Sequence, residues 1–179
     1  MVYNDIHTHK LAVHPEDIAI VSTIVRKDIE ENLSSYRSYG IHPWYIEDVR
    51  EQIEILCGFA HLPETVAIGE AGLDKLAEVD MDGQLDVFRQ QALLAEEIRK
   101  PLIIHCVKAW EELLAIRKGL SPEMPWIIHG FRGNEQLAKQ LTTHGFYLSF
   151  GPLFNAEAVK HVDPERIFAE TDDKEVDIR

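Results

Sequence analysis

Short apolar runs alternate along this chain with longer amphipathic stretches, and most of the runs end in a polar residue. Their content of β-branched and aromatic residues is typical of strands. The pattern predicts eight strands, at residues 2–9, 17–25, 36–43, 65–70, 101–105, 125–129, 145–151 and 166–172.

The stretches between these runs predict helices. Residues 80–100 carry apolar side chains at close to helical spacing, and Pro101 is a plausible stop. Asn134 is typical of a helix N-cap, and Gly119 and Gly145 are typical of helix C-caps. These signals predict four further helices, at 46–60, 108–119, 134–145 and 155–164.

Strands that mostly alternate with helices predict a parallel α/β sheet, and eight strands are the number that closes a (β/α)₈ barrel. Such barrels typically have ~250 residues, whereas this chain has 179. Three segments are shorter than a full barrel requires. They are the loop between His9 and Asp17, residues 26–35, and the chain after Asp172. Residues 26–35 can hold at most a short turn of helix. We therefore predict a single domain over residues 1–179, a compact (β/α)₈ TIM barrel with shortened first helices and no C-terminal closing helix. A doubly wound open sheet is the alternative.

Composition and charge narrow the class of protein. No apolar run approaches the roughly 20 residues that span a bilayer, and the start of the chain lacks the pattern of a signal peptide. Cys57 and Cys106 are too few for a disulfide framework, so we expect a cytoplasmic protein without membrane contact. The net charge of −13 argues against binding nucleic acid through a broad basic surface. It leaves open the binding of phosphate through metal ions.

Side chains that can bind metal recur where the predicted strands end. In a parallel barrel these ends meet at one face, where barrel active sites are built. Any one of these residues has an ordinary structural explanation, but parallel barrel strands are otherwise apolar. Four imidazoles and two carboxylates suit two divalent ions, such as zinc, manganese, magnesium or nickel. The predicted ligands are His7, His9, Glu70, His105, His129 and Asp172.

Several motifs carry a resemblance to a known family. They are DIHTH (5–9), GIHP (40–43), AIGEAGLD (67–74), the stretch 84–106, IIHGFRGN (127–134), GFYLSFGP (145–152) and AETD (169–172). The set resembles the TatD family of metal-dependent hydrolases, whose barrel fold agrees with the strand count.

The resemblance implies a role for each matching residue. His7 and His9 match the pair that binds one metal, Glu70 matches a bridging carboxylate, and His105 and His129 match later ligands. Asp172 matches an aspartate that contacts metal and takes the proton of the attacking water. His42 matches a residue at the pocket rim. The chain departs from the family at Cys106-Val107, where Ser-Arg is usual, at Lys174, where proline is usual, and at Arg132, where a small residue is common.

The predicted function is metal-dependent hydrolysis, with Asp172 and Glu70 as catalytic residues. A deoxyribonuclease acting on strand ends comes first, because the resemblance implies it. A hydrolase of small amides, esters or phosphoesters, and a metal-binding protein without turnover, are the alternatives. His42, Arg132 and Lys108 are candidates for substrate binding, and Lys75 is a weaker one.

The remaining polar and aromatic residues receive structural interpretations. We expect His14, His61, His144 and His161 at the surface, Cys57 in a helix core, and Cys106 between strand and helix. Trp44, Trp110 and Trp126 are interpreted as packing residues, with stacking of a base or ring as the alternative for Trp44.

Overall fold

The computed structural model describes residues 1–29 and 35–179. Its eight strands form one parallel sheet in the order of the sequence. They are β1 (Asn4–Thr8), β2 (Ile18–Ile24), β3 (Tyr36–Gly40), β4 (Thr65–Asp74), β5 (Leu102–Val107), β6 (Trp126–Ile128), β7 (Tyr147–Phe150) and β8 (Ile167–Ala169).

The sheet closes through the chain that follows β8. Thr8 and Asp172 form a parallel bridge, in which the Asp172 N–H donates to His7 O at 3.0 Å and the His9 N–H donates to Asp172 O at 3.2 Å. The predicted (β/α)₈ barrel is therefore confirmed. The doubly wound alternative is wrong, because its strand order would reverse part-way along the sheet.

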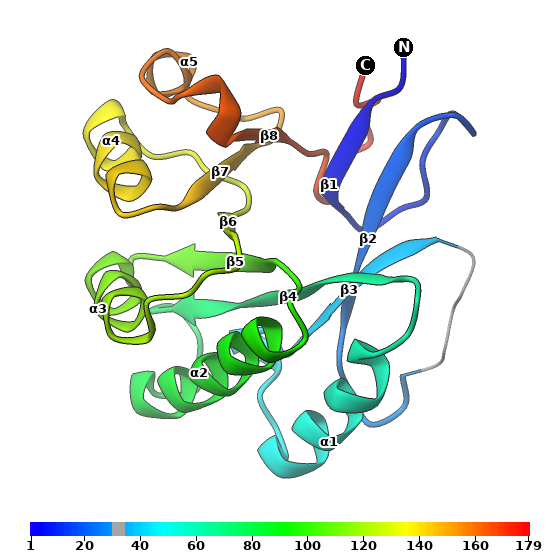
Figure 1. Cartoon of the computed structure of the whole chain (residues 1–179), viewed down its shortest axis with the longest axis vertical. Helices are drawn as coiled ribbons and strands as arrows, with labels where there is room; N and C mark the ends of the chain where they lie inside the picture. The colour runs from blue at the N-terminus through cyan, green and yellow to red at the C-terminus, as the bar shows by residue number, and fades with distance from the viewer. Residues whose placement is uncertain (30–34) are drawn as a thin grey trace.

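The helices lie outside the barrel, around β3 to β8 (Figure 1). They are α1 (Val49–Ala60), α2 (Met81–Glu97), α3 (Trp110–Leu120), α4 (Glu135–Thr143) and α5 (Ala156–Val159), with short 3₁₀ turns at Pro43–Tyr45 and Pro164–Arg166. Among the described residues no helix joins β1 to β2 or follows β8. The short turn predicted within 26–35 falls partly on residues 30–34, which lie outside the described part of the chain.

Two of the predicted helix ends agree with the structure, and two do not. Asn134 Oδ1 accepts from Leu137 N at 2.9 Å, and Gly145, at φ +86°, follows the end of α4 as predicted. Gly119 is not a cap, because α3 continues to Leu120 and Ser121 takes the left-handed conformation instead. The last helix, α5, ends at Val159 and not at the predicted 164. A helix could not have continued through Asp163, because a residue that precedes proline disfavours helical ψ.

Strand β4 runs four residues beyond the predicted end at Glu70. It continues beside β5, with Gly72 opposite His105 and Asp74 opposite Val107. A Cβ at position 72 would lie 1.9 Å from the His105 carbonyl oxygen, so only glycine permits this approach. The extension places Asp74 beside the metal-ligand candidates.

The main hydrophobic core lies between the sheet and its helices. Trp126 is buried there, with its ring centroid 5.4 Å from Phe88 and 6.0 Å from Phe146. The prediction for Cys57 is wrong, because that thiol is exposed. The buried positions of α1 are Gln52, Leu56 and Ala60, which are spaced by four residues, and Cys57 lies off this stripe.

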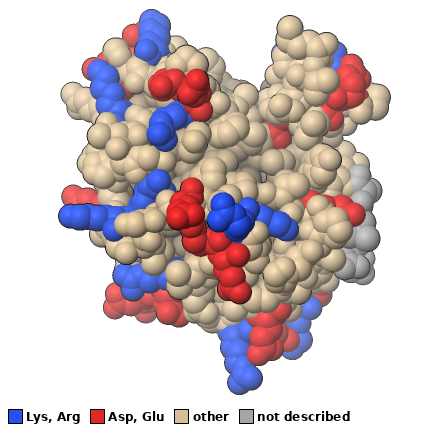
Figure 2. Space-filling view, in the orientation of Figure 1, with Lys and Arg blue, Asp and Glu red and all other residues tan. Residues whose placement is uncertain are grey.

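The C-terminal residues are attached to the loop after β1. Asp177 pairs with His14 Nε2 at 2.8 Å and Arg179 Nε pairs with Asp17 at 2.9 Å, so the two chain ends lie close together (Figure 1). On the face shown in Figure 2, acidic and basic side chains are interspersed. None of the described helices has the length and apolar content that crossing a membrane requires.

Candidate metal centre

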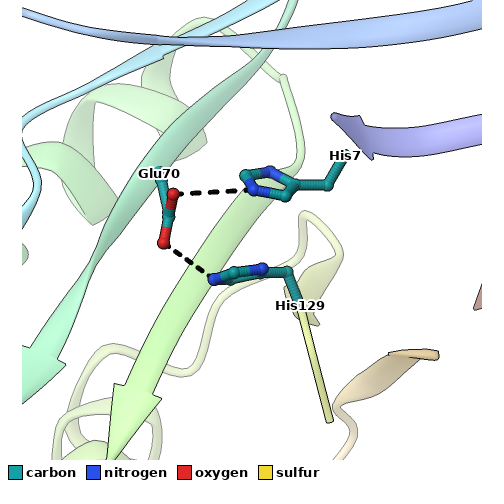
Figure 3. A group of neighbouring side chains, drawn as sticks. All are labelled: His7, Glu70 and His129. Carbon is teal, nitrogen blue, oxygen red and sulfur yellow. Dashed lines mark ion pairs between the residues drawn. The ribbon is translucent and has the colours of Figure 1, made fainter. Parts of the chain in front are cut away.

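Glu70 lies at the centre of the site, where the carboxyl ends of the strands converge. Its side chain is buried, with 5% of the residue exposed. His7 and His129 approach it from two different strand ends (Figure 3). One carboxylate oxygen lies 2.7 Å from His129 Nε2, 3.0 Å from His105 Nδ1 and 3.3 Å from His42 Nε2. The other lies 3.5 Å from His7 Nε2.

Asp172 completes the cluster from the other side of His7. One of its carboxylate oxygens lies 3.6 Å from His7 Nε2 and 3.6 Å from His9 Nε2. The preceding residue, Thr171, fixes this segment through Asp5, because its backbone N–H and hydroxyl donate to the two oxygens of that buried carboxylate at 3.1 and 2.6 Å. The structure thus brings together all six side chains that the sequence singled out as metal ligands.

The donor set fits divalent metal ions. His7 is fully buried, yet neither of its ring nitrogens has a hydrogen-bond partner among the described residues. A buried polar atom without a partner is costly. Ligand bonds of about 2.1 Å at tetrahedral angles leave donor atoms about 3.4 Å apart, and His7 Nε2 lies 3.5 and 3.6 Å from its two carboxylate neighbours. These distances suit donors that share an ion better than they suit direct hydrogen bonds.

Two further carboxylates lie beside the imidazoles, and sequence analysis assigned them no role. His105 Nε2 lies 3.1 Å from Asp74 Oδ2, and His129 Nδ1 lies 3.5 Å from Glu170 Oε1. A carboxylate on one ring nitrogen holds the proton there and turns the other nitrogen's lone pair toward the centre. The signal was present in the GEAGLD and AETD motifs, in which Asp74 and Glu170 stand four and two residues from predicted ligands.

The charges within the cluster stabilise one another. Burial alone would raise the pKa of Glu70, but the charge of His129 and hydrogen bonds from three imidazoles lower this pKa well below its usual range. Burial opposes the charged form of His129, yet Glu70 and Glu170 raise the pKa of this imidazole well above its ordinary value. The neighbouring imidazoles of His7 and His9 lower the pKa of Asp172, so this carboxylate is ionised at neutral pH.

The candidates for substrate binding lie in different surroundings. Arg132 and Lys108 are exposed and line a cavity of 650 Å³ that also includes His105, His129 and Asp172. Among the described residues neither cation forms an ion pair, whereas Lys75 pairs with Glu112 at 2.7 Å. His42 is not at an exposed rim but is buried beside Glu70, with 6% exposed.

The residues given structural interpretations mostly lie as expected. His61 and His144 are exposed, and His14 and His161 form surface pairs with Asp177 and Glu135. Cys106 packs against the core, and burial raises the pKa of its thiol to about 12. Trp110 packs near Phe131, with ring centroids 6.4 Å apart.

The packing interpretation is wrong for Trp44, which is 56% exposed. Its ring centroid lies 6.3 Å from that of His105.

Comparison with known proteins identifies the family. The profile described as TatD related DNase matches residues 6–175. The chain belongs to the TatD family. It is 36% identical over 154 residues to the uncharacterized metal-dependent hydrolase YabD of Bacillus subtilis, covering 80% of this chain and 60% of YabD. It is 31% identical over 112 residues to the 3'-5' ssDNA/RNA exonuclease TatD of Citrobacter rodentium, covering 61% of this chain and 43% of that enzyme.

A solved TatD structure shares the fold. The TatD family hydrolase of Entamoeba histolytica superposes with a TM-score of 0.73 at 22% identity, over 94% of this chain and 73% of that protein. This TatD chain thus spans 60% of the length of YabD and less than half of the Citrobacter exonuclease.

Proposed function

We propose that this TatD chain is a metal-dependent phosphodiesterase that removes nucleotides from the ends of single-stranded nucleic acid. The observation that supports it best is the arrangement of Glu70, which lies within 3.5 Å of four imidazoles. A carboxylate shared in this way would hold two divalent ions together with the imidazoles around it. When bound, such ions lower the pKa of water to about 7 and neutralise charge that develops on phosphate.

The protein side chains have separate tasks in this proposal. His7, His9, His105, His129 and Asp172 hold the ions together with Glu70, and Asp74 and Glu170 hold two of the imidazoles in the required tautomer. Asp172 also accepts the proton of the attacking water, for which an ionised carboxylate at the open side of the cluster is suited. Arg132 and Lys108 hold the phosphates of the substrate beside the cluster.

A second candidate is hydrolysis of small phosphoesters, esters or amides. The net charge of −13 favours it, because long nucleic acids are repelled by an acidic surface. The two candidates differ in how much substrate they need outside the cavity, so substrate length separates them.

The test begins with metal content. Protein purified without chelator or histidine tag should contain close to two divalent ions per chain, and His7→Ala and His129→Ala should each lower that number. Unchanged metal content in both variants would refute the ligand assignment.

The second step is turnover with added zinc, manganese, magnesium or nickel. Single-stranded DNA and RNA labelled at the 5' end should be shortened progressively from the 3' end, as the name of the Citrobacter relative leads us to expect. Intact oligonucleotides together with cleavage of a simple phosphate or carboxylate ester would replace the nuclease proposal with the second candidate. Tight metal binding without hydrolysis of any substrate would refute both.

A further inference from the structure

A second hollow, here called the Trp44 groove, lies near His105, which also lines the cavity that contains Lys108 and Arg132. It has a volume of 330 Å³, within the range of small-molecule sites, and is lined by Trp44, Tyr45, Leu76, Ala77 and Glu78. Trp44 is 56% exposed and Leu76 is 65% exposed. Two large apolar side chains therefore face solvent within reach of the metal-ligand candidates.

Both walls of the Trp44 groove are fixed to a single buried carboxylate. Asp74 is 0% exposed, and one of its oxygens accepts from the indole N–H of Trp44 at 2.6 Å, while the other accepts from the backbone N–H of Leu76 at 2.7 Å. The oxygen that holds Trp44 also lies 3.1 Å from His105 Nε2. The groove and the metal centre thus share one support.

Trp44 is held from a second side as well. Its backbone N–H donates to His42 Nδ1 at 3.1 Å, and the two rings meet edge to face with centroids 5.5 Å apart. The exposure of the indole is therefore not the result of a loose side chain. A rigid, exposed aromatic face loses little conformational entropy when a ligand stacks on it.

The charges at the groove indicate which part of a substrate fits there. Among its lining residues the charged one is acidic, Glu78, whereas Lys108 and Arg132, which form no ion pair with any described residue, line the cavity beside His105. A phosphate suits the cavity, and a flat uncharged ring with N–H donors suits the groove. Nucleobases have this character, and every base offers a face for stacking.

We propose that the Trp44 groove is a binding subsite for one nucleobase of a single-stranded substrate, stacked on the indole of Trp44 and packed against Leu76. Asp74 acts as a positioning residue that fixes this subsite relative to His105. The identity of the substrate rests on the proposed function, but the stacking itself can be measured without hydrolysis.

The experiment compares Trp44→Phe with Trp44→Leu, because both variants lose the indole N–H and only the first keeps an aromatic face. The probe is a short single-stranded oligonucleotide with phosphorothioate linkages, which resist hydrolysis, and a counterpart in which the bases are replaced by abasic sites. Binding to metal-loaded protein is measured by fluorescence anisotropy. Tyr36→Leu removes an aromatic side chain that is 50% exposed at the opposite end of β3, and serves as the control.

We expect the wild-type chain, Tyr36→Leu and Trp44→Phe to bind the base-bearing probe at least about five-fold more tightly than the abasic probe, since stacking contributes on this scale. Trp44→Leu should bind the two probes equally. Base-bearing probe should also quench tryptophan fluorescence in the wild type more than in Trp44→Phe.

Retention of the base preference by Trp44→Leu, or its absence from the wild type, would overturn the proposal. Failure of the nuclease proposal has a different signature. Ordinary oligonucleotides would then remain intact with every added metal, while the loss of base preference in Trp44→Leu would still support the stacking subsite.

Discussion

Replacing Asp74 by asparagine tests whether this buried carboxylate sets the tautomer of His105. The carboxylate accepts from Leu76 N, Trp44 Nε1 and His105 Nε2 at 2.7, 2.6 and 3.1 Å. Asparagine has one oxygen and one NH₂ group, so in either orientation the NH₂ faces at least one of these donors. His105 then gains from placing its proton on Nδ1, the nitrogen that lies 3.0 Å from Glu70. That tautomer cannot bind metal at the centre.

The magnitude follows from the bonds that are lost. One or two hydrogen bonds to a charged acceptor, at about 1.5–3 kcal/mol each, predict that the substitution lowers the free energy of unfolding by about 1.5–6 kcal/mol. Loss of an orienting partner of a metal-binding histidine predicts a 10- to 100-fold lower metal affinity, on the order of other such substitutions.

The assay is metal competition against a chromophoric chelator, combined with urea unfolding of the metal-free protein. The control is Asp80→Asn, a chemically identical change at an exposed residue whose Oδ1 accepts from Gly83 N at 2.8 Å at the start of α2. Asparagine caps a helix as well as aspartate does, so stability and metal affinity should stay near wild type. Wild-type metal affinity in Asp74→Asn would refute the reasoning, even if that variant were less stable.

Three further predictions concern other parts of the chain. Arg132→Ala should reduce the slope of log affinity for single-stranded oligonucleotides against log salt concentration by about 0.7, the contribution of one phosphate contact, and an unchanged slope would contradict a role in phosphate binding. Because burial raises the pKa of Cys106 to about 12, its thiol stays protonated at pH 8, and mass spectrometry after brief iodoacetamide treatment should find the exposed Cys57 alkylated and Cys106 unmodified. Asn134→Ala removes the cap of α4 and should lower the free energy of unfolding by about 1 kcal/mol without changing metal content, whereas Asn134→Asp should leave both near wild type.

The barrel and the gathering of the candidate ligands at one face could be predicted because each rests on local signals. Predicted strand runs that end in His105, His129 or Glu70 identify both a buried strand and a polar side chain near its carboxyl end. Closure into a barrel follows from the number of strands and from the rule that parallel strands present their carboxyl ends together. The helix caps Asn134 and Gly145 were predictable for the same reason, since a cap depends on its own residue and a few neighbours.

Predictions from local sequence patterns were wrong where burial or strand length depends on a neighbouring element. Cys57 lies in an amphipathic helix, but whether a position beside the apolar stripe is covered depends on what packs there. Trp44 was interpreted as packing because large aromatic residues are usually buried, yet a hydrogen bond from its indole to Asp74 holds it at the surface. The end of β4 was misplaced because β5 supplies the pairing that extends it to Asp74.

The sequence by itself thus determined that residue types able to bind metal recur at or near the carboxyl ends of the strands, and through them the fold class and the family. Only the tertiary structure decided that Glu70 is shared among four imidazoles, that Asp74 and Glu170 lie beside two of these rings, and that His42 is buried among them. The physical reason is that the position of a residue in its strand fixes only where its Cα and Cβ lie. Its hydrogen-bond partners come from strands that are distant in sequence and become neighbours only when the barrel closes.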